Sequence, residues 1–372
     1  MSKPAIDNKY LQKTLESLLS IPSPSGMTEA AVNMVCGELD DMGIPYTLTN
    51  RGAIKAFVAG KKGAPHRAVA VHLDTLGAMV KRLKPNGRLG LVAVGTWSSR
   101  FAEGARVLIH SDNGKKYRGT VLPLKASGHT YHKEIDSQPT TWENLEIRVD
   151  EACKNSDDLW KIGIRVGDFI SVDTNFEISD SGYINSRHLD DKAGVASVLA
   201  ALRALKKAKT TPSMNCHILF TTTEEIGTGG AHIIDPEVKE LVSIDNGTMA
   251  PEQNTCEFGV TIAMQDLGGP FDRPLSMHLI DICRRENLEF SRDVFNYYLS
   301  DGAGAQKAGH DLRVALMCFG LDASHGYERV HIKSLQTVAS LVMGYLLSEQ
   351  LSVPAKGNAK KSKTDTERQT QK

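Results

Sequence analysis

Residues 68–74 read Ala-Val-Ala-Val-His-Leu-Asp, a short apolar run that ends in a histidine and an acid. The pattern returns at residues 218–225, where Ile-Leu-Phe-Thr-Thr-Thr is followed by Glu224 and Glu225. Short apolar runs bounded by polar residues are typical of strands buried in an α/β sheet. In such sheets the ends of the strands converge on one crevice, where ligands bind, so we expect these polar side chains to lie close together.

Other acids and a second histidine occupy comparable positions. Asp190 and Asp191 precede a helical stretch, Asp245 follows Leu-Val-Ser-Ile, and His325 comes soon after Val-Ala-Leu-Met-Cys-Phe. Taken singly, such an acid could also be a helix cap or a solvated turn residue. Two histidines and several carboxylates in one crevice are instead typical of a hydrolytic site with two metal ions.

Strand and helix patterns alternate in the segments that carry these residues. Apolar residues recur at helical spacing between residues 8 and 20 and again between 191 and 207. Further helices are expected at 28–42, 272–286 and 332–350, and strands at 54–59, 67–73, 215–222, 240–245 and 313–319. This alternation predicts an α/β fold with a doubly wound, mostly parallel sheet.

Residues 77–183 have a different texture, in which short runs rich in Val, Ile and Tyr alternate with turn residues. Asn113-Gly114 is a strong hairpin signal between two such runs. Strands are expected at 106–110, 117–121, 145–149, 169–172 and 176–178. We interpret this block as a small β-rich domain, PDZ-like or barrel-like, inserted into a catalytic domain that consists of residues 1–76 and 184–353. Residues 354–372 have the composition of a disordered tail.

Composition narrows the range of partners. Lys plus Arg and Asp plus Glu both number 44, so the formal net charge of zero gives no electrostatic reason for a nucleic-acid or membrane-surface partner. The six cysteines form no Cys-x-x-Cys pair, and the N-terminus has no apolar signal-peptide core. These features favour a reduced, cytoplasmic setting without a membrane anchor.

The order and spacing of the motifs resemble the dinuclear metallo-aminopeptidases that include glutamyl aminopeptidase and the tetrahedral, self-compartmentalising peptidases. The resemblance covers roughly residues 8–350 and rests on Ile21-Pro22-Ser23-Pro24-Ser25-Gly26, His72-Leu73-Asp74, Leu189-Asp190-Asp191-Lys192-Ala193-Gly194, Glu224-Glu225-Ile226-Gly227 and Asp245. The family usually has Arg where this chain has Gly229. It usually reads His-Ser/Thr-Pro-x-Glu where this chain reads His325-Gly326-Tyr327-Glu328.

The resemblance implies five metal ligands and two catalytic side chains. The ligands are His72 and Asp245 for one metal, Glu225 and His325 for the other, and Asp190 as the bridge. Glu224 is implied to be the general base, and Asp74 to orient the ring of His72.

His331 is the alternative to His325 as the last ligand. His325 lies closer to the end of the apolar run, where the other ligands also sit. His331 precedes the apolar stretch 332–347 and is expected at the start of the final helix, where partial positive charge disfavours a cation. We therefore expect His325 to be the ligand.

The resemblance also implies an activity and an assembly. It implies a metal-dependent aminopeptidase that removes N-terminal residues from peptides with two divalent ions, zinc or cobalt foremost and manganese also compatible. The alternative is a dinuclear amidohydrolase or deacylase acting on a small non-peptide or N-acylated amide. A homo-oligomer, specifically a dodecamer built through the insert, is implied as well. Gly95-Thr96-Trp97-Ser98 and Leu124-Lys125-Ala126-Ser127-Gly128-His129 resemble the branch encoded with genes for the osmoprotectant N-acetylglutaminylglutamine amide.

Overall fold

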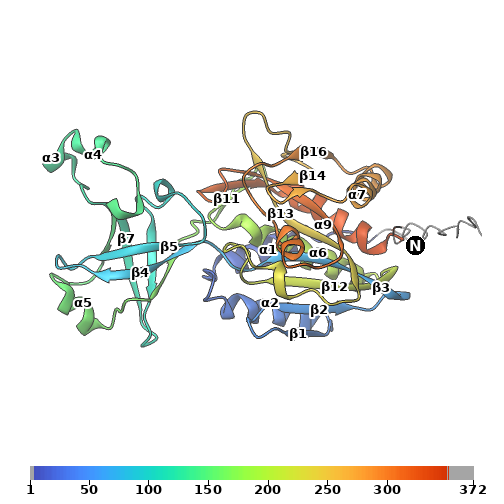
Figure 1. Cartoon of the computed structure of the whole chain (residues 1–372), viewed down its shortest axis with the longest axis horizontal. Helices are drawn as coiled ribbons and strands as arrows, with labels where there is room; N and C mark the ends of the chain where they lie inside the picture. The colour runs from blue at the N-terminus through green and yellow to red at the C-terminus, as the bar shows by residue number, and fades with distance from the viewer. Residues whose placement is uncertain (1–3, 350, 352–372) are drawn as a thin grey trace, which may run out of the picture.

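The computed structural model of the chain describes residues 4–349 and 351. Figure 1 shows two bodies side by side, a small barrel and a larger layered body that contains both ends of the described chain. The expected disordered tail at 354–372 lies outside the described residues. Within the described part, none of the helices combines the length and the apolar composition of a membrane span.

The larger body is built on a mixed sheet. Its strands run in the order β1 (Tyr46–Leu48), β2 (Ile54–Val58), β12 (Met214–Thr221), β3 (Lys62–His72), β13 (Val238–Met249), β17 (Arg313–Asp322), β18 (Glu328–His331), β11 (Tyr183–Ser186) and β10 (Glu177–Ile178). Beside β17 lies β14 (Val260–Asp266), which also pairs with β15 (Gly269–Pro270) and β16 (Phe290–Val294).

The prediction of a mostly parallel sheet holds only for its centre. Strands β12, β3, β13 and β17 run parallel to one another, whereas their outer neighbours β2, β14 and β18 are antiparallel to them. Short connections join several of the flanking strands, and antiparallel pairs need only such short links. The four parallel strands still bring their ends to one edge, as the sequence predicted.

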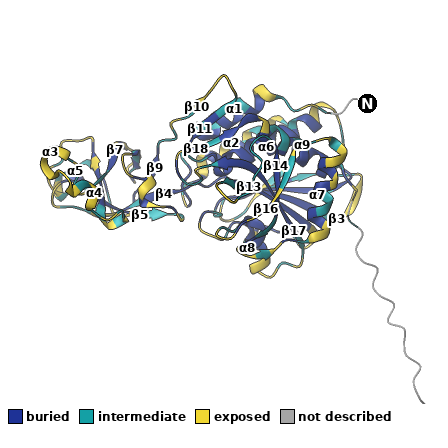
Figure 2. Ribbon diagram, turned by 90° about the horizontal axis from the view of Figure 1, so that it is seen from above, coloured by how far each residue is buried: buried dark blue, intermediate teal, exposed yellow. Residues whose placement is uncertain are grey.

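Helices cover both faces of this sheet. One face packs against α1 (Asn8–Leu19), α2 (Glu29–Asp41), α6 (Leu189–Lys207), α7 (Arg273–Glu286) and α9 (Ile332–Leu347). The other face packs against α8 (Asp301–Lys307) and the segment after the 3₁₀ turn η3 (Gly230–His232). Alternate residues of β3 point to opposite faces, so Val69 and Val71 enter the first core and Ala68 and Ala70 the second. Figure 2 shows the buried interior along the central strands.

The small body is a closed antiparallel barrel. Its strands close in the order β4 (Gly77–Leu83), β5 (Leu89–Val94), β8 (Leu145–Val149), β7 (Lys116–Pro123), β6 (Arg106–His110) and β9 (Phe169–Val172). The strands carry three short helices, α3 (Gly128–Tyr131), α4 (Glu134–Ser137) and α5 (Ser156–Ile162), and the turns η1 (Ser99–Phe101) and η2 (Trp142–Asn144). The hairpin predicted at Asn113-Gly114 is confirmed, because β6 and β7 pair across it. Strands β4 and β5 were not foreseen.

One predicted strand lies in a different body than expected. The sequence placed residues 176–178 in the inserted domain, but β10 pairs with β11 and thereby extends the large sheet. The barrel strands end at Val172, and the chain returns to the larger body immediately afterwards.

Candidate metal centre

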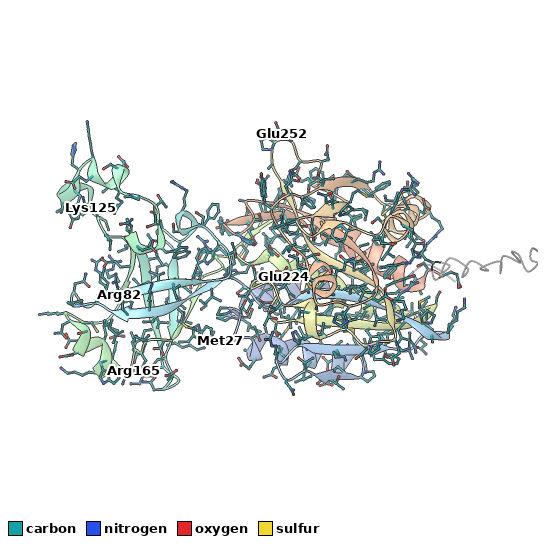
Figure 3. All side chains as sticks on the ribbon, in the orientation of Figure 1. Met27, Arg82, Lys125, Arg165, Glu224 and Glu252 are labelled. Atoms are coloured by element: carbon teal, nitrogen blue, oxygen red, sulfur yellow. The ribbon has the colours of Figure 1, made fainter. Side chains whose placement is uncertain are left out.

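The ends of the central strands and the start of α6 meet at one cleft. His72 is the last residue of β3, Glu224 and Glu225 follow β12, and Asp245 lies within β13. These side chains, together with Asp190, lie in or beside a cleft of about 1000 Å³. In Figure 3, Glu224 lies in the part of the larger body nearer the barrel.

Two groups of possible ligands share one carboxylate. One ligand atom each from His72, Asp190 and Asp245 lies within 4.8 Å of the others. A second group with the same spacing consists of Asp190, Glu225 and His325. Nε2 of His72 is 3.2 Å from Oδ1 of Asp190, and Nε2 of His325 is 3.5 Å from Oδ2 of the same residue. Asp190 therefore offers one oxygen to each histidine.

The backbone at the start of α6 places Asp190 between the two histidines. Asp190 and Asp191 have non-helical backbone angles before the regular helix begins. Asn246 donates from Nδ2 to Oδ2 of Asp190 at 2.7 Å and to Oδ1 of Asp245 at 3.1 Å. The amide of Asn246 thus holds the two carboxylates in one arrangement.

In each histidine, the ring nitrogen that points away from the acids, Nδ1, forms a hydrogen bond with a backbone carbonyl. Nδ1 of His72 is 2.9 Å from the carbonyl oxygen of Asp74, and Nδ1 of His325 is 2.8 Å from that of Thr96. A carbonyl oxygen can only accept, so Nδ1 carries a hydrogen in both rings, and Nε2 is the nitrogen that faces the acids. Both Nε2 atoms can therefore ligate a metal.

The Asp74 carboxylate lies near the ring of His72 but has closer partners. The side-chain oxygen of Asp74 is 3.7 Å from Nδ1 of His72, which the backbone carbonyl of Asp74 contacts more closely. The carboxylate instead accepts from the backbone N–H groups of Glu224 at 3.1 Å and Glu225 at 3.3 Å, and from Ser25 Oγ at 2.5 Å. Strand β3 ends at His72, so Asp74 lies just beyond it.

His331 does not reach the cleft. It caps the start of α9, where its Nδ1 accepts from the backbone N–H of Lys333 at 3.1 Å. Its Nε2 lies 3.0 Å from the carbonyl of Ser181, and its ring packs against Tyr183 and Phe258. Of the two histidines, His325 is the one the structure brings to the acids.

Burial and mutual repulsion govern the titration of the acids. Burial, with the nearby acids, raises the pKa of the Glu225 carboxyl to about 8 and the pKa values of Glu224 and Asp245 well above their ordinary range. Burial also acts to raise the pKa of Asp190, but its contacts with His325 and His72 bring that pKa well below its ordinary value.

The pKa values of the two histidines are governed by burial and by the nearby acids, which act in opposite directions. Burial acts to lower the pKa of His325, yet its contacts with Asp190 and Glu225 raise that pKa to about 10. The same competition, with Asp190 foremost among the raising contacts, brings the pKa of His72 well above its ordinary value.

The donor set fits divalent metals. Imidazole nitrogens and carboxylate oxygens are the ligands that zinc, cobalt and manganese accept. The raised pKa values of the acids express an excess of buried negative charge, and bound cations would neutralise it. Asp190 presents its two oxygens in two directions, as a bridging carboxylate must.

Several supporting residues were not foreseen from the sequence. Asp191 is fully buried, and its carboxylate accepts from the backbone N–H of His72 at 3.1 Å. Glu328 accepts from the backbone N–H groups of His325 at 2.8 Å and Asp190 at 3.2 Å. The signal for Asp191 was Gly194, where a Cβ would lie 2.1 Å from its carboxylate. Ser25 belongs to the motif at residues 21–26 that the resemblance quoted, but the sequence assigned it no role.

Gly229, where the resembling family usually has Arg, faces another buried acid. A Cβ at this position would lie 2.0 Å from Oδ1 of Asp301, which therefore occupies the space next to the glycine. The other oxygen of Asp301 accepts from Thr221 Oγ1 at 2.8 Å. Asp301 lines the same cleft as Glu224.

Comparisons with known proteins agree with this arrangement. Residues 52–341 match the model of the M42 glutamyl aminopeptidase family. The chain is 37% identical to the putative aminopeptidase YhfE of Bacillus subtilis over 341 residues, which is 91% of this chain and 98% of that protein.

Solved structures share the fold. An aminopeptidase from Desulfurococcus kamchatkensis superposes with a TM-score of 0.82 at 19% identity, covering 91% of this chain and 95% of that one. The TET1 peptidase of Pyrococcus horikoshii gives 0.80 at 19% identity, covering 91% and 100%. The match over most of the chain shows that the protein is a peptide hydrolase of the M42 glutamyl aminopeptidase family.

Proposed function

We propose that the protein is an aminopeptidase that removes N-terminal residues from peptides and holds two divalent metal ions per chain. The observation that carries this proposal is the shared position of Asp190, which belongs to both ligand groups. His72 and Asp245 would complete the first group, and Glu225 and His325 the second. Zinc or cobalt suits these ligands best, and manganese is compatible.

Glu224 is the side chain we propose as the general base. It lines the cleft but belongs to neither ligand group. Its Oε2 is 3.8 Å from Nε2 of His72, so it lies beside the first group without entering it. Asp74 fixes the backbone that carries it, through the hydrogen bond from the Glu224 N–H.

The proposed reaction is hydrolysis of the first peptide bond. Two bound ions would supply polarisation of the scissile carbonyl and a water whose pKa is lowered toward about 7. Glu224 takes the proton from the attacking water and gives it to the leaving amine. The surplus of carboxylates in the cleft would attract the positively charged α-amine of a peptide.

Substrates with and without a free amine test this function against the deacylase alternative. Metal-free full-length protein would be loaded with Zn²⁺, Co²⁺ or Mn²⁺ and assayed on a panel of aminoacyl chromophores and on their N-acetylated counterparts. We expect turnover of the free-amine substrates only. Turnover confined to the N-acylated amides would overturn the proposal.

We further propose a dodecamer built through the barrel, with the active sites facing an interior cavity. The support is the likeness to the P. horikoshii TET1 peptidase, which can assemble into a tetrahedron or a large octahedral shell. Light scattering on the full chain tests this, and a monomer would contradict it. The link to osmoprotectant synthesis stays a prediction.

A further inference from the structure

A loop of the inserted barrel reaches into the cleft of the larger body. This loop, residues 95–101, follows β5 and ends with the turn η1. Gly95, Thr96, Trp97, Ser98 and Phe101 all line the cleft together with Glu224 and His325. Figure 1 shows the barrel beside the larger body, and the shared lining of the cleft places this loop next to the candidate ligands.

The 95–101 loop fixes the ring of His325. The carbonyl of Thr96 accepts from Nδ1 of His325 at 2.8 Å, across 229 residues of sequence. That hydrogen bond occupies Nδ1 and turns Nε2 toward Asp190 and Glu225, so Nε2 is the nitrogen that would bind a metal. Since the accepting group is a backbone carbonyl, the position of the loop backbone sets the orientation of the ring.

The loop also passes close to the other acid of the second group. Gly95 has φ of +80°, and a Cβ there would lie 2.6 Å from Leu76 and 3.5 Å from Cβ of Glu225. The loop therefore bonds to His325 and lies beside Glu225, the two residues that distinguish the second ligand group from the first.

Trp97 anchors the loop on the barrel. Its indole N–H donates to the carbonyl of Gly77, the first residue of β4, at 3.0 Å. Its ring packs edge-on against Trp142, with 4.8 Å between centroids, and belongs to the barrel core. Any change in the placement of the barrel relative to the larger body would therefore move Thr96.

Arg187 ties the loop to the segment that carries His325. Its guanidinium donates to the carbonyl of Phe101 at 2.8 Å and, in a longer contact of 3.5 Å, to the carbonyl of Gly326. The ring of Phe101 lies against Gly326, where a Cβ would come within 3.2 Å of it. Arg187 thus bridges one loop of each body.

We propose that Arg187 and Trp97 are positioning residues for the second metal ligand group, and that the inserted barrel is thereby a working part of the active site. The inference rests on the proposed function, in which His325 ligates a metal. The positioning contacts concern the second group, because no hydrogen bond found in the described residues links the 95–101 loop to His72 or Asp245.

The test is a stepwise Co²⁺ titration of the metal-free full-length chain, in which calorimetry measures the heat of each addition. We expect two binding steps for the wild type, and His325→Ala identifies which step belongs to the second group. Arg187→Gln should weaken that step by roughly 10–100-fold, the usual cost of removing a group that orients a ligand. The other step should stay unchanged, and Arg187→Lys should recover part of the loss.

Two controls separate positioning from a general structural effect. Arg100→Gln removes a guanidinium from the same loop that contacts Thr140, and should leave both steps unchanged. In the double variant Arg187→Gln/His325→Ala, the remaining step should match that of His325→Ala alone. An equal weakening of both steps, or a weaker remaining step in the double variant, would overturn the proposal.

Trp97→Phe keeps an aromatic ring but removes the donor to Gly77, and carries the test if Arg187→Gln does not fold. We expect a weaker second step, and wild-type binding by both variants would overturn the positioning role. Fewer than two steps in the wild type would instead contradict the two-ion function itself, so the two failures are distinguishable.

Discussion

The two histidines of the candidate metal centre are held in different ways. His72 ends a central strand, its side chain is 2% exposed, and both its ring and its backbone N–H bond to residues of the larger body. The side chain of His325 is 31% exposed, and the residue lies in a loop with φ of +64°. Its ring depends on a carbonyl of the inserted barrel.

This difference shows that the two halves of the centre, the first and the second ligand group, are held in different ways. The first half is built into the sheet, and the second is assembled from loops. The parallel strands fix His72 and Asp245 together with the core. The second group needs the 95–101 loop, the end of β17 and the start of α6 to meet correctly. We expect the second group to be the more easily perturbed.

The largest effect is expected where the two halves join. Asp190→Asn removes the charge from the one carboxylate that belongs to both groups. We expect the loss of both bound metals and a fall in peptide hydrolysis to the level of chelator-treated protein. Metal content and turnover measure this, and retention of two tightly bound ions would show that Asp190 is not shared.

Replacing His325 and His331 one at a time tests which of the two completes the second ligand group. His325→Ala should lose one metal and nearly all activity, while His331→Ala should keep both metals, because His331 caps α9 away from the cleft. Elemental analysis and turnover of the two variants decide between them. The reverse pattern would move the ligand to His331.

A smaller effect on activity is expected for a change at Glu224, the proposed base, because it belongs to neither ligand group. Glu224→Gln should keep both metals while kcat falls by about 10²–10⁴-fold. Glu225→Gln serves as the matched comparison and should weaken the second metal. Near-wild-type turnover by Glu224→Gln would refute its role as base.

The sheet-bound half was largely predictable from the sequence. Apolar runs marked the central strands, and His72 and Asp245 lie where those runs placed them. The orienting role of Asp74 stays a prediction, because its carboxylate lies 3.7 Å from Nδ1 of His72 and bonds more closely to the backbone N–H groups of Glu224 and Glu225. The antiparallel flanks of the sheet were also missed, since their strands are short.

The loop-built half could be predicted only in part. The sequence favoured His325 over His331, but nothing in it connected Thr96 or Arg187 with that histidine. Such contacts join residues far apart in the chain and arise only when the barrel and the larger body are in place. The supporting roles of Asp191 toward His72 and of Glu328 toward Asp190 were overlooked for the same reason, because each accepts from a backbone N–H group far away in the sequence.

The most direct test of the shared centre is the number of metals in the wild-type chain. Full-length protein would be stripped with chelator, loaded with Zn²⁺ or Co²⁺, freed of excess metal and analysed for metal per chain. We expect two ions per chain, with activity lost on stripping and restored on loading. One ion or none in fully active protein would contradict a centre in which Asp190 serves two ligand groups.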